Sequence, residues 1–347
     1  MTNKACILSI SGPVLHDEES ALFADQKPWG VILMGRSCQT RDQIRRCVHD
    51  IWKAVGREIL IFIDQEGGRV ARLKSPEWPL FPRGELYGAL YARDPELGLE
   101  ATWLGHRLMA DELTRMGIHA DCAPVCDLPQ PGAHDVIGDR AFGTDPDTVG
   151  TLATAALKGL EDGGVAGVIK HIPGHGRSTA DSHIELPRVT AGENELASDF
   201  AAFRHVTHAP MAMTAHISYD HFDEGRAATV SPIMINEVIR RRIGFDGLLM
   251  TDDLGMQALG GTLTERADQS IAAGCDMLLH CSGFLNEPGD IIAEMREVAE
   301  AAPVLSGKAL QRAEAAEAAS KREKPFDVEA GWLRFKSLIP DVGVMRV

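Results

Sequence analysis

The chain has 347 residues, of which 44% are hydrophobic, so it can bury one large core or two smaller ones. Its formal net charge of −15 argues against binding to nucleic acid or to an anionic membrane. The seven cysteines show no zinc-ribbon spacing and favour a reducing compartment over a disulfide framework. The first residues lack the apolar run of a secretory signal, so we expect a cytoplasmic protein.

Short apolar runs recur along the chain, and each ends in polar or glycine-rich residues. The runs that we expect to form strands are Ala5–Ser9, Gly30–Met34, Ile59–Ile63, His119–Val125, Val165–Ile169, Met211–Ala215, Gly247–Met250 and Asp276–Leu279. Most of these runs are separated by segments with helical periodicity. About eight strands that alternate with about eight helices predict parallel βαβ units.

Local signals mark the beginnings of several helices. Thr40–Val55 opens with Thr40 and Gln43 at capping-box spacing. Asp145 and Ser231 each precede a proline, which is the pattern of an N-cap followed by proline in the first helical turn.

We therefore expect an α/β protein, a single (β/α)8 TIM-type barrel over residues 1–303. A C-terminal helix and an irregular tail, residues 304–347, are expected to pack on the barrel, with the helix over residues 306–324 solvated. The alternative architecture is a doubly wound open sheet.

The segment from Lys170 to His183 reads KHIPGHGRSTADSH and directly follows the apolar run Val165–Ile169. It holds six ionisable side chains, and a folding core has no use for them because burying unpaired charge is costly. Loops that leave the carboxyl ends of parallel strands are where α/β enzymes carry their chemistry. The competing interpretation is a charged loop in solvent.

Polar residues follow four other predicted strands in the same way. They are Asp64–Arg72, Gly138–Arg140, His216 and Thr251–Leu254. Adjacent residues of an extended chain point to opposite sides, so only one acid of the pair in Thr251–Leu254 can enter the barrel mouth. Read separately, these groups also fit ordinary surface ion pairs and a structural histidine.

Together these residues predict one polar site at the barrel mouth. Its members are Asp64, Arg72, Arg140, Lys170, His171, His183, His216 and Asp252. Carboxylates beside arginine and lysine suit a ligand with many hydroxyl groups. An aspartate that faces a histidine suits a nucleophile with a general acid/base.

The chain resembles glycoside hydrolase family 3, and within it the bacterial β-N-acetylhexosaminidases of the NagZ type. The resemblance lies in the blocks Asp64–Arg72, Lys170–Gly176 with Asp181–His183, and Thr251–Leu254, together with Arg140. It covers roughly residues 1 to 300, and the Lys170–Gly176 block is its most specific part.

The resemblance implies a retaining glycosidase that needs no metal or other cofactor. Asp252 stands at the position of the nucleophile, and His183 with Asp181 at that of the acid/base dyad. The positions that hold the terminal N-acetylglucosamine match Asp64, Arg72, Arg140, Lys170 and His171, with His216 beside them. The implied substrate is a small carbohydrate, N-acetylglucosaminyl-1,6-anhydro-N-acetylmuramic acid with or without its peptide, in cell-wall recycling.

A histidine acid/base is chemically reasonable, because an unperturbed imidazole titrates near pH 6.5 and both gives and takes protons at working pH. Asp181 precedes His183 by two residues, which in an extended segment puts both side chains on one side. Other readings stay open: a different β-hexoside, phosphate as the acceptor, a metal-dependent barrel hydrolase, a Schiff-base lyase using Lys170, and a sugar sensor without activity.

Overall fold

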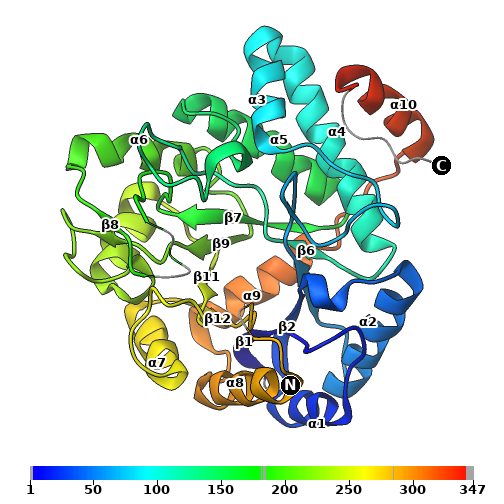
Figure 1. Ribbon diagram of the computed structural model, residues 1–347, viewed down its shortest axis with the longest axis vertical. Coiled ribbons are helices and arrows are strands. Elements are labelled where there is room, and N and C mark those ends of the chain that lie inside the picture. The colour runs from blue at the N-terminus through cyan, green and yellow to red at the C-terminus, as the bar shows by residue number, and fades with distance from the viewer. Residues whose placement is uncertain (1–2, 181, 183–184, 284, 341–347) are drawn as a thin grey trace.

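The computed structural model describes residues 3–180, 182, 185–283 and 285–340, and within them eight strands close into a barrel (Figure 1). In pairing order the strands are β1 (Lys4–Leu8), β12 (Met277–Leu279), β11 (Leu248–Asp253), β9 (Met211–Thr214), β7 (Ala166–Ile172), β6 (Ala120–Asp121), β3 (Leu60–Ile63) and β2 (Pro28–Leu33). Every neighbouring pair is parallel. The predicted (β/α)8 barrel is confirmed, and the open sheet is wrong.

Helices surround the barrel and connect its strands (Figure 1). They are α1 (Asp17–Gln26), α2 (Arg41–Val55), α3 (Gly84–Arg93), α4 (Pro95–Thr114), α5 (Pro146–Asp162), α6 (Glu193–Arg204), the π-type η4 (Met234–Ile243), α7 (Leu263–Ala273), α8 (Pro288–Ala301), α9 (Gly307–Ala319) and α10 (Val328–Leu338). In the ranges described, no helix combines the length and the apolar character that crossing a bilayer requires.

All eight apolar runs contribute a barrel strand, with shifted ends. The largest shift is at β6, which keeps only Ala120–Asp121 of the predicted run; Pro124, which follows shortly after, has no N–H to continue a ladder. The predicted caps of α2 and α5 are also found, and Ser231 Oγ accepts the N–H of Met234, the first residue of η4, at 3.0 Å. Thr40 and Gln43 form the capping box of α2, and the carboxylate of Asp145 accepts the N–H of Thr148 at the start of α5.

The two-residue period of the strands decides which side chains enter the barrel. Along β11, Leu248 and Met250 belong to the cluster that fills the barrel, whereas Leu249 belongs to the cluster between barrel and helices. Continuing that alternation, Asp252 lines the cavity at the barrel mouth, whereas the carboxylate of Asp253 accepts the N–H groups of Gly255 and Cys281. The same alternation turns Asp64 inward after β3 and Lys170 inward on β7.

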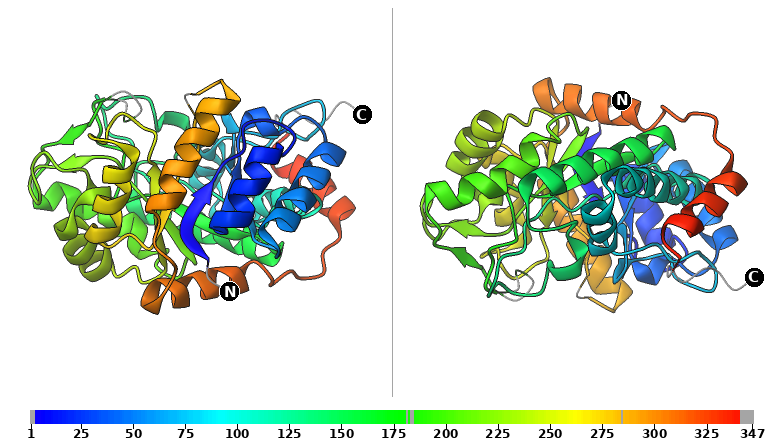
Figure 2. Two further views of the ribbon diagram at one scale, coloured as in Figure 1. Left: turned by 90° about the horizontal axis from the view of Figure 1, so that it is seen from below. Right: turned by 90° about the horizontal axis from the view of Figure 1, so that it is seen from above.

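Helix α9 lies across the amino-terminal end of the barrel, as Figure 2 shows in its left view, where this helix runs along the bottom. The side chains of Ala313, Ala316 and Ala319 are buried in the cluster that fills the barrel. The expectation of a solvated helix is therefore wrong for this face, since small alanine side chains let α9 close the open strand ends.

Beyond α9 the chain forms α10, where the sequence shows no clear periodicity. Phe335 of α10 is 1% exposed and lies against Tyr87 of α3. A Cβ atom at Gly105 of α4 would come within 3.0 Å of the Phe335 ring. Tertiary packing, rather than helix propensity, holds this short segment in place.

An ion-pair cluster fastens α9 to the barrel. Arg312 of α9 and Arg240 of η4 both contact the carboxylate of Asp276, at 2.9 and 2.7 Å. That carboxylate also accepts the N–H of Leu249 at 2.9 Å, so the three donors share one buried acceptor. Arg312 pairs in addition with Asp246, whose side chain is 75% exposed.

Replacing Asp276 with Asn leaves both arginines without their shared counter-charge. We expect the free energy of unfolding to fall by about 3 kcal/mol, the low end for breaking a buried pair. Asp246→Asn is the matched control and should cost less than about 1 kcal/mol, because its partner contact is exposed. Urea unfolding followed by circular dichroism checks both variants, and equal losses would contradict the proposed difference.

Candidate active site

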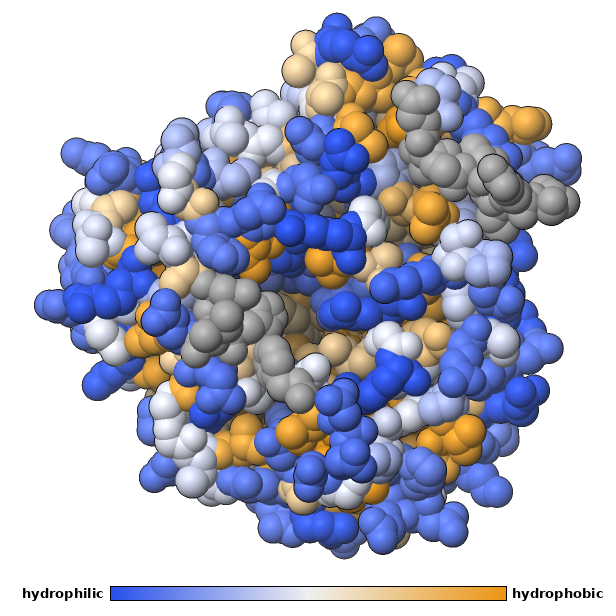
Figure 3. All heavy atoms as spheres, in the orientation of Figure 1, coloured by the Kyte–Doolittle hydropathy of each residue, from blue (hydrophilic) through white to orange (hydrophobic). Residues whose placement is uncertain are grey.

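A small cavity of about 140 Å3 lies at the carboxyl ends of the barrel strands. Figure 3 shows a hollow near the middle of the face drawn in Figure 1, with hydrophilic residues beside it. The polar residues that line the cavity are Asp64, Glu66, Arg72, Arg140, Lys170, His171, His175, Ser182 and Asp252. A larger cavity, about 1310 Å3, is lined by residues such as Trp103, Gly167 and Arg312 and holds none of the predicted site residues.

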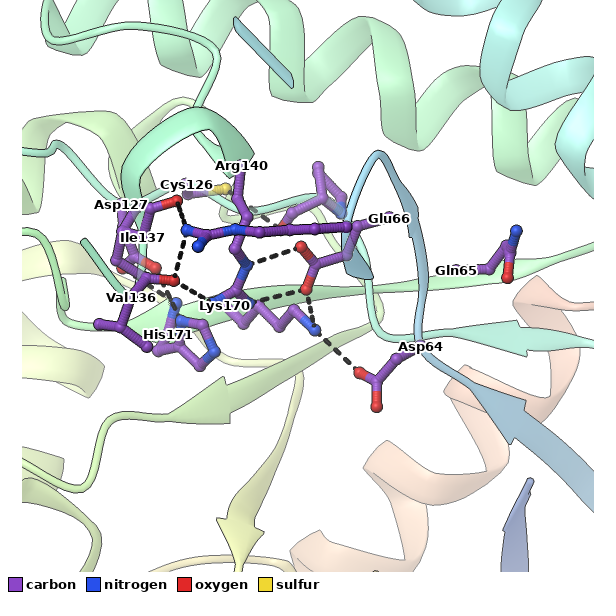
Figure 4. A network of polar contacts seen from close by, with 12 residues as sticks. Asp64, Gln65, Glu66, Cys126, Asp127, Val136, Ile137, Arg140, Lys170 and His171 are labelled. Atoms are coloured by element: carbon purple, nitrogen blue, oxygen red, sulfur yellow. Dashed lines mark hydrogen bonds and ion pairs between the residues drawn. The ribbon is translucent and has the colours of Figure 1, made fainter. Parts of the chain in front are cut away.

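Five charged side chains form a continuous chain in the wall of the small cavity. Figure 4 shows Arg140, Glu66, Lys170 and Asp64 of this chain. Arg140 donates from Nε and Nη2 to the two oxygens of Glu66, both at 2.8 Å. Lys170 Nζ lies 2.6 Å from Glu66 Oε1 and 2.9 Å from Asp64 Oδ1. Arg72 Nη2 donates to Asp64 Oδ2 at 2.8 Å. Cations and carboxylates therefore alternate, and three cations face two carboxylates.

A short hairpin brings Asp64, Glu66 and Arg72 together. Directly after β3 the chain forms β4 (Gln65–Gly67) and β5 (Val70–Ala71), which pair antiparallel. The turn requires glycine, because Gly67 has a φ of +96° and a Cβ there would lie 2.2 Å from the carbonyl oxygen of Pro82. The hairpin thus places Glu66 beside the strand-end acid Asp64.

The pKa values of this chain follow from its pairing. Burial works against the charge of Glu66, but Arg140 and Lys170 outweigh it and lower the pKa of this carboxyl to about 2. Burial is likewise outweighed at Asp64, where Lys170 and Arg72 hold the pKa well below its usual range. For Lys170, burial lowers the pKa, but Asp64 and Glu66 raise it well above the ordinary value. All three groups are therefore charged at neutral pH.

Asp252 lies in the same cavity, and its Oδ1 accepts the N–H of Asp253 at 2.8 Å. Burial raises its pKa, but His216, His171 and that N–H outweigh burial and leave the pKa below its usual value. An ionised carboxylate that lines a cavity can act as a nucleophile toward a ligand bound there.

His216 lies outside the lining of this cavity. Its Nδ1 contacts Thr229 Oγ1 at 2.7 Å and its Nε2 contacts the carbonyl oxygen of Asp253 at 3.1 Å. Both ring nitrogens are engaged by the protein, and burial lowers the pKa of the ring. The structure thus places His216 as a support for the strand that carries Asp252, and its expected contact with a sugar stays a prediction.

His171 lines the cavity and is held by Asp127, a fully buried residue that follows β6. Asp127 Oδ2 lies 2.7 Å from His171 Nδ1, while Oδ1 accepts the N–H groups of His171 and His175. His175 Nε2 lies 3.1 Å from Ser182 Oγ. Burial, with the neighbouring His171, lowers the pKa of His175 to about 4, so this ring is neutral at working pH.

Asp181 and His183 lie outside the described residues. Ser182, between them, is 2% exposed, and its carbonyl oxygen accepts the N–H of Ala258 at 3.2 Å. Across the described ranges, which leave out both members of the predicted dyad, no three His, Cys, Asp or Glu side chains are grouped as metal ligands.

The structure brings together Asp64, Arg72, Arg140, Lys170, His171 and Asp252. The roles of Glu66, Asp127 and His175 are not predicted from the sequence. Glu66 lies two residues after Asp64, so in an extended segment both side chains point to the same side. This inference can be made only once it is known that the segment forms an extended hairpin. Asp127 follows an apolar run by two residues, and no local pattern indicates that it meets His171 and His175, 44 and 48 residues later.

The model of the Glycosyl hydrolase family 3 N terminal domain matches residues 6–315 of the chain. The Beta-hexosaminidase of Alkalilimnicola ehrlichii is 38% identical over 306 residues, which cover 86% of this chain and 85% of that protein. The Beta-hexosaminidase of Tolumonas auensis is also 38% identical, over 80% of this chain and 82% of that protein.

Solved structures of similar enzymes also match the fold of this chain. NagZ from Neisseria gonorrhoeae, in complex with N-trifluoroacetyl-D-glucosamine, matches with a TM-score of 0.82 at 30% identity and covers 99% of this chain and 97% of its own. A family 3 β-N-acetylglucosaminidase from Paenibacillus matches with a TM-score of 0.83 at 26% identity, over 96% of this chain and 66% of its own. By its sequence, its barrel and the charged cavity at the barrel mouth, the chain belongs to glycoside hydrolase family 3 and is an enzyme of the β-hexosaminidase kind.

Proposed function

We propose that the chain is a retaining exo-β-N-acetylglucosaminidase that releases terminal N-acetylglucosamine through a covalent glycosyl-enzyme. The observation that carries this proposal is the position of Asp252 in a small cavity whose wall is a row of charged hydrogen-bonding groups. The N. gonorrhoeae NagZ structure, which holds an N-acylated glucosamine, supports the choice of sugar.

The charged row leaves hydrogen-bonding capacity for a sugar. Lys170 has three N–H groups and gives two of them to Asp64 and Glu66, so one remains for a hydroxyl oxygen. Asp64 accepts one bond on each oxygen and keeps lone pairs for two sugar hydroxyl groups. Charge-assisted hydrogen bonds of this kind are short and directional, and they fix one orientation of the ring.

In the proposed reaction Asp252 attacks the anomeric carbon and forms an ester with it, while His183 protonates the departing glycosidic oxygen. His183 then takes a proton from water, which attacks the same carbon and releases Asp252. Asp181 would orient the imidazole and stabilise its charged form, as an aspartate does beside a catalytic histidine in other hydrolases.

We further propose a cytoplasmic substrate, N-acetylglucosaminyl-1,6-anhydro-N-acetylmuramic acid with or without its peptide, and a role in peptidoglycan recycling. The seven free cysteines support a reducing compartment. One alternative has phosphate in place of water as the acceptor. The other has a different β-hexoside as the substrate. Assaying aryl glycosides of several sugars with and without phosphate distinguishes them, and full activity in a chelator argues against a metal-dependent reaction.

Replacing Asp252 with Ala should abolish turnover of every β-N-acetylglucosaminide, because no covalent intermediate can form. The measurement is nitrophenol release, together with the mass of the intact protein after incubation with a slow fluorinated glycosyl donor. Wild type should gain the mass of one sugar and the variant should not. Asp246→Asn, far from the cavity, serves as the control; near-wild-type turnover by Asp252→Ala would show that another group is the nucleophile.

Replacing His183 with Ala should slow substrates with poor leaving groups most, because a nitrophenolate departs with little protonation. Single-turnover rates of the glycosylation step, compared for a nitrophenyl glycoside and a disaccharide, measure this difference. Equal losses on both substrates would rule out His183 as the acid.

Replacing Glu66 with Gln removes the carboxylate shared by Arg140 and Lys170. Losing a hydrogen bond to a charged group costs about 1.5–3 kcal/mol, so we expect kcat/KM to fall about 10- to 100-fold, mainly through KM. Glu85→Gln, at an exposed ion pair with Arg83, is the matched control and should leave both constants unchanged. A loss confined to kcat would instead place Glu66 in the chemical step.

A further inference from the structure

We propose that Asp127 is a positioning residue that keeps the proton of His171 on Nδ1 and so presents Nε2 of this ring to the bound sugar. The inference rests on the proposed function in one respect, that the ligand of the cavity is a sugar. It assigns a part in the site to a residue that touches neither the cavity nor the sugar itself.

Asp127 is bound on all sides by donors. Its side chain is fully buried, Oδ1 accepts the N–H of His175 at 2.7 Å and that of His171 at 3.1 Å, and Oδ2 meets His171 Nδ1 at 2.7 Å. Figure 4 shows Asp127 beside His171. Burial raises the pKa of Asp127, but His171 and the N–H donors outweigh it, so the pKa lies below its usual value. The carboxylate is therefore ionised at working pH.

An ionised carboxylate is only an acceptor, so the ring nitrogen that it contacts must carry the proton. In the neutral ring this leaves Nε2 with a lone pair. His171 lines the cavity with Asp252, and its Nδ1 is occupied, so Nε2 is the ring atom that it can offer to a ligand. We infer that Nε2 accepts a hydroxyl proton of the sugar and thereby fixes the ring beside the nucleophile.

Asp127 also anchors the chain at His171 and His175 through their backbone N–H groups. This anchoring role can be separated from its effect on the proton of His171. In Asp127→Asn the amide oxygen can still accept both backbone N–H groups, while the NH2 group replaces Oδ2 opposite His171 Nδ1. The reverse orientation would set the NH2 group against two N–H donors and is disfavoured. The variant therefore keeps the anchor, but the neutral ring must move its proton to Nε2.

The first measurement is the tautomer of His171, read from long-range nitrogen–proton NMR spectra of labelled protein at a pH where the ring is neutral. Wild type should show the proton on Nδ1, and Asp127→Asn should show it on Nε2. A wild-type ring with its proton on Nε2 would overturn the proposal, whether or not the variant folds. This readout needs no substrate, so it stands apart from failure of the proposed function, which would appear as wild type without glycosidase activity.

The second measurement is a double-mutant cycle on release of nitrophenol from the aryl β-N-acetylglucosaminide. Asp127→Asn should lower kcat/KM about 10- to 100-fold in the wild-type background, the cost of one mispaired polar contact. In the background of His171→Ala it should have no further effect, because the ring through which Asp127 acts is gone. An equal loss in both backgrounds would show that Asp127 only anchors the loop, and the proposal would be wrong.

Discussion

The site depends on one electrostatic constraint, that the carboxylates of Asp64 and Glu66 at the barrel mouth must each meet cations. Asp64 and Glu66 could not remain ionised in that setting without Lys170 between them and an arginine at either end. The side chain of Lys170 is 3% exposed, and the counter-charges of its ammonium group come from the protein. The pairing restrains five side chains, and a rigid set of donors and acceptors is what recognition of a hydroxylated ring needs.

This arrangement is possible because the barrel collects distant parts of the chain at one end. Parallel strands all deliver their carboxyl ends to the same rim, and the period of two turns alternate side chains inward. Asp64, Lys170 and Asp252 come from three different strands or strand ends, yet they line one cavity. The other end carries no predicted site residue and is closed by α9, whose alanines allow the helix to approach the strand ends. Stability and chemistry are thus separated along the barrel axis.

Histidines at this rim have distinct surroundings, and the surroundings set what each can do. His216 has both nitrogens engaged behind Asp252, His175 is kept neutral by burial, and His171 has one nitrogen bound to Asp127. Their contacts distinguish them, since all three lie at or shortly after the carboxyl end of a strand. A site that needs several imidazoles can therefore assign each a separate function through its partners.

The sequence by itself determined the alternation of strands and helices, the strand-end positions of the charged residues and the capping of α2 and α5, because these depend on neighbours within a few residues. It also carried the family blocks that led to Asp252 and Lys170. Only the tertiary structure decided that Glu66 shares its carboxylate between Arg140 and Lys170, that Asp127 holds His171, and that His216 lies behind the cavity. It likewise decided that α9 closes the barrel and that α10 forms at all. The physical reason is range: these outcomes depend on groups that lie tens to hundreds of residues apart in the chain, and no local pattern records which of them meet.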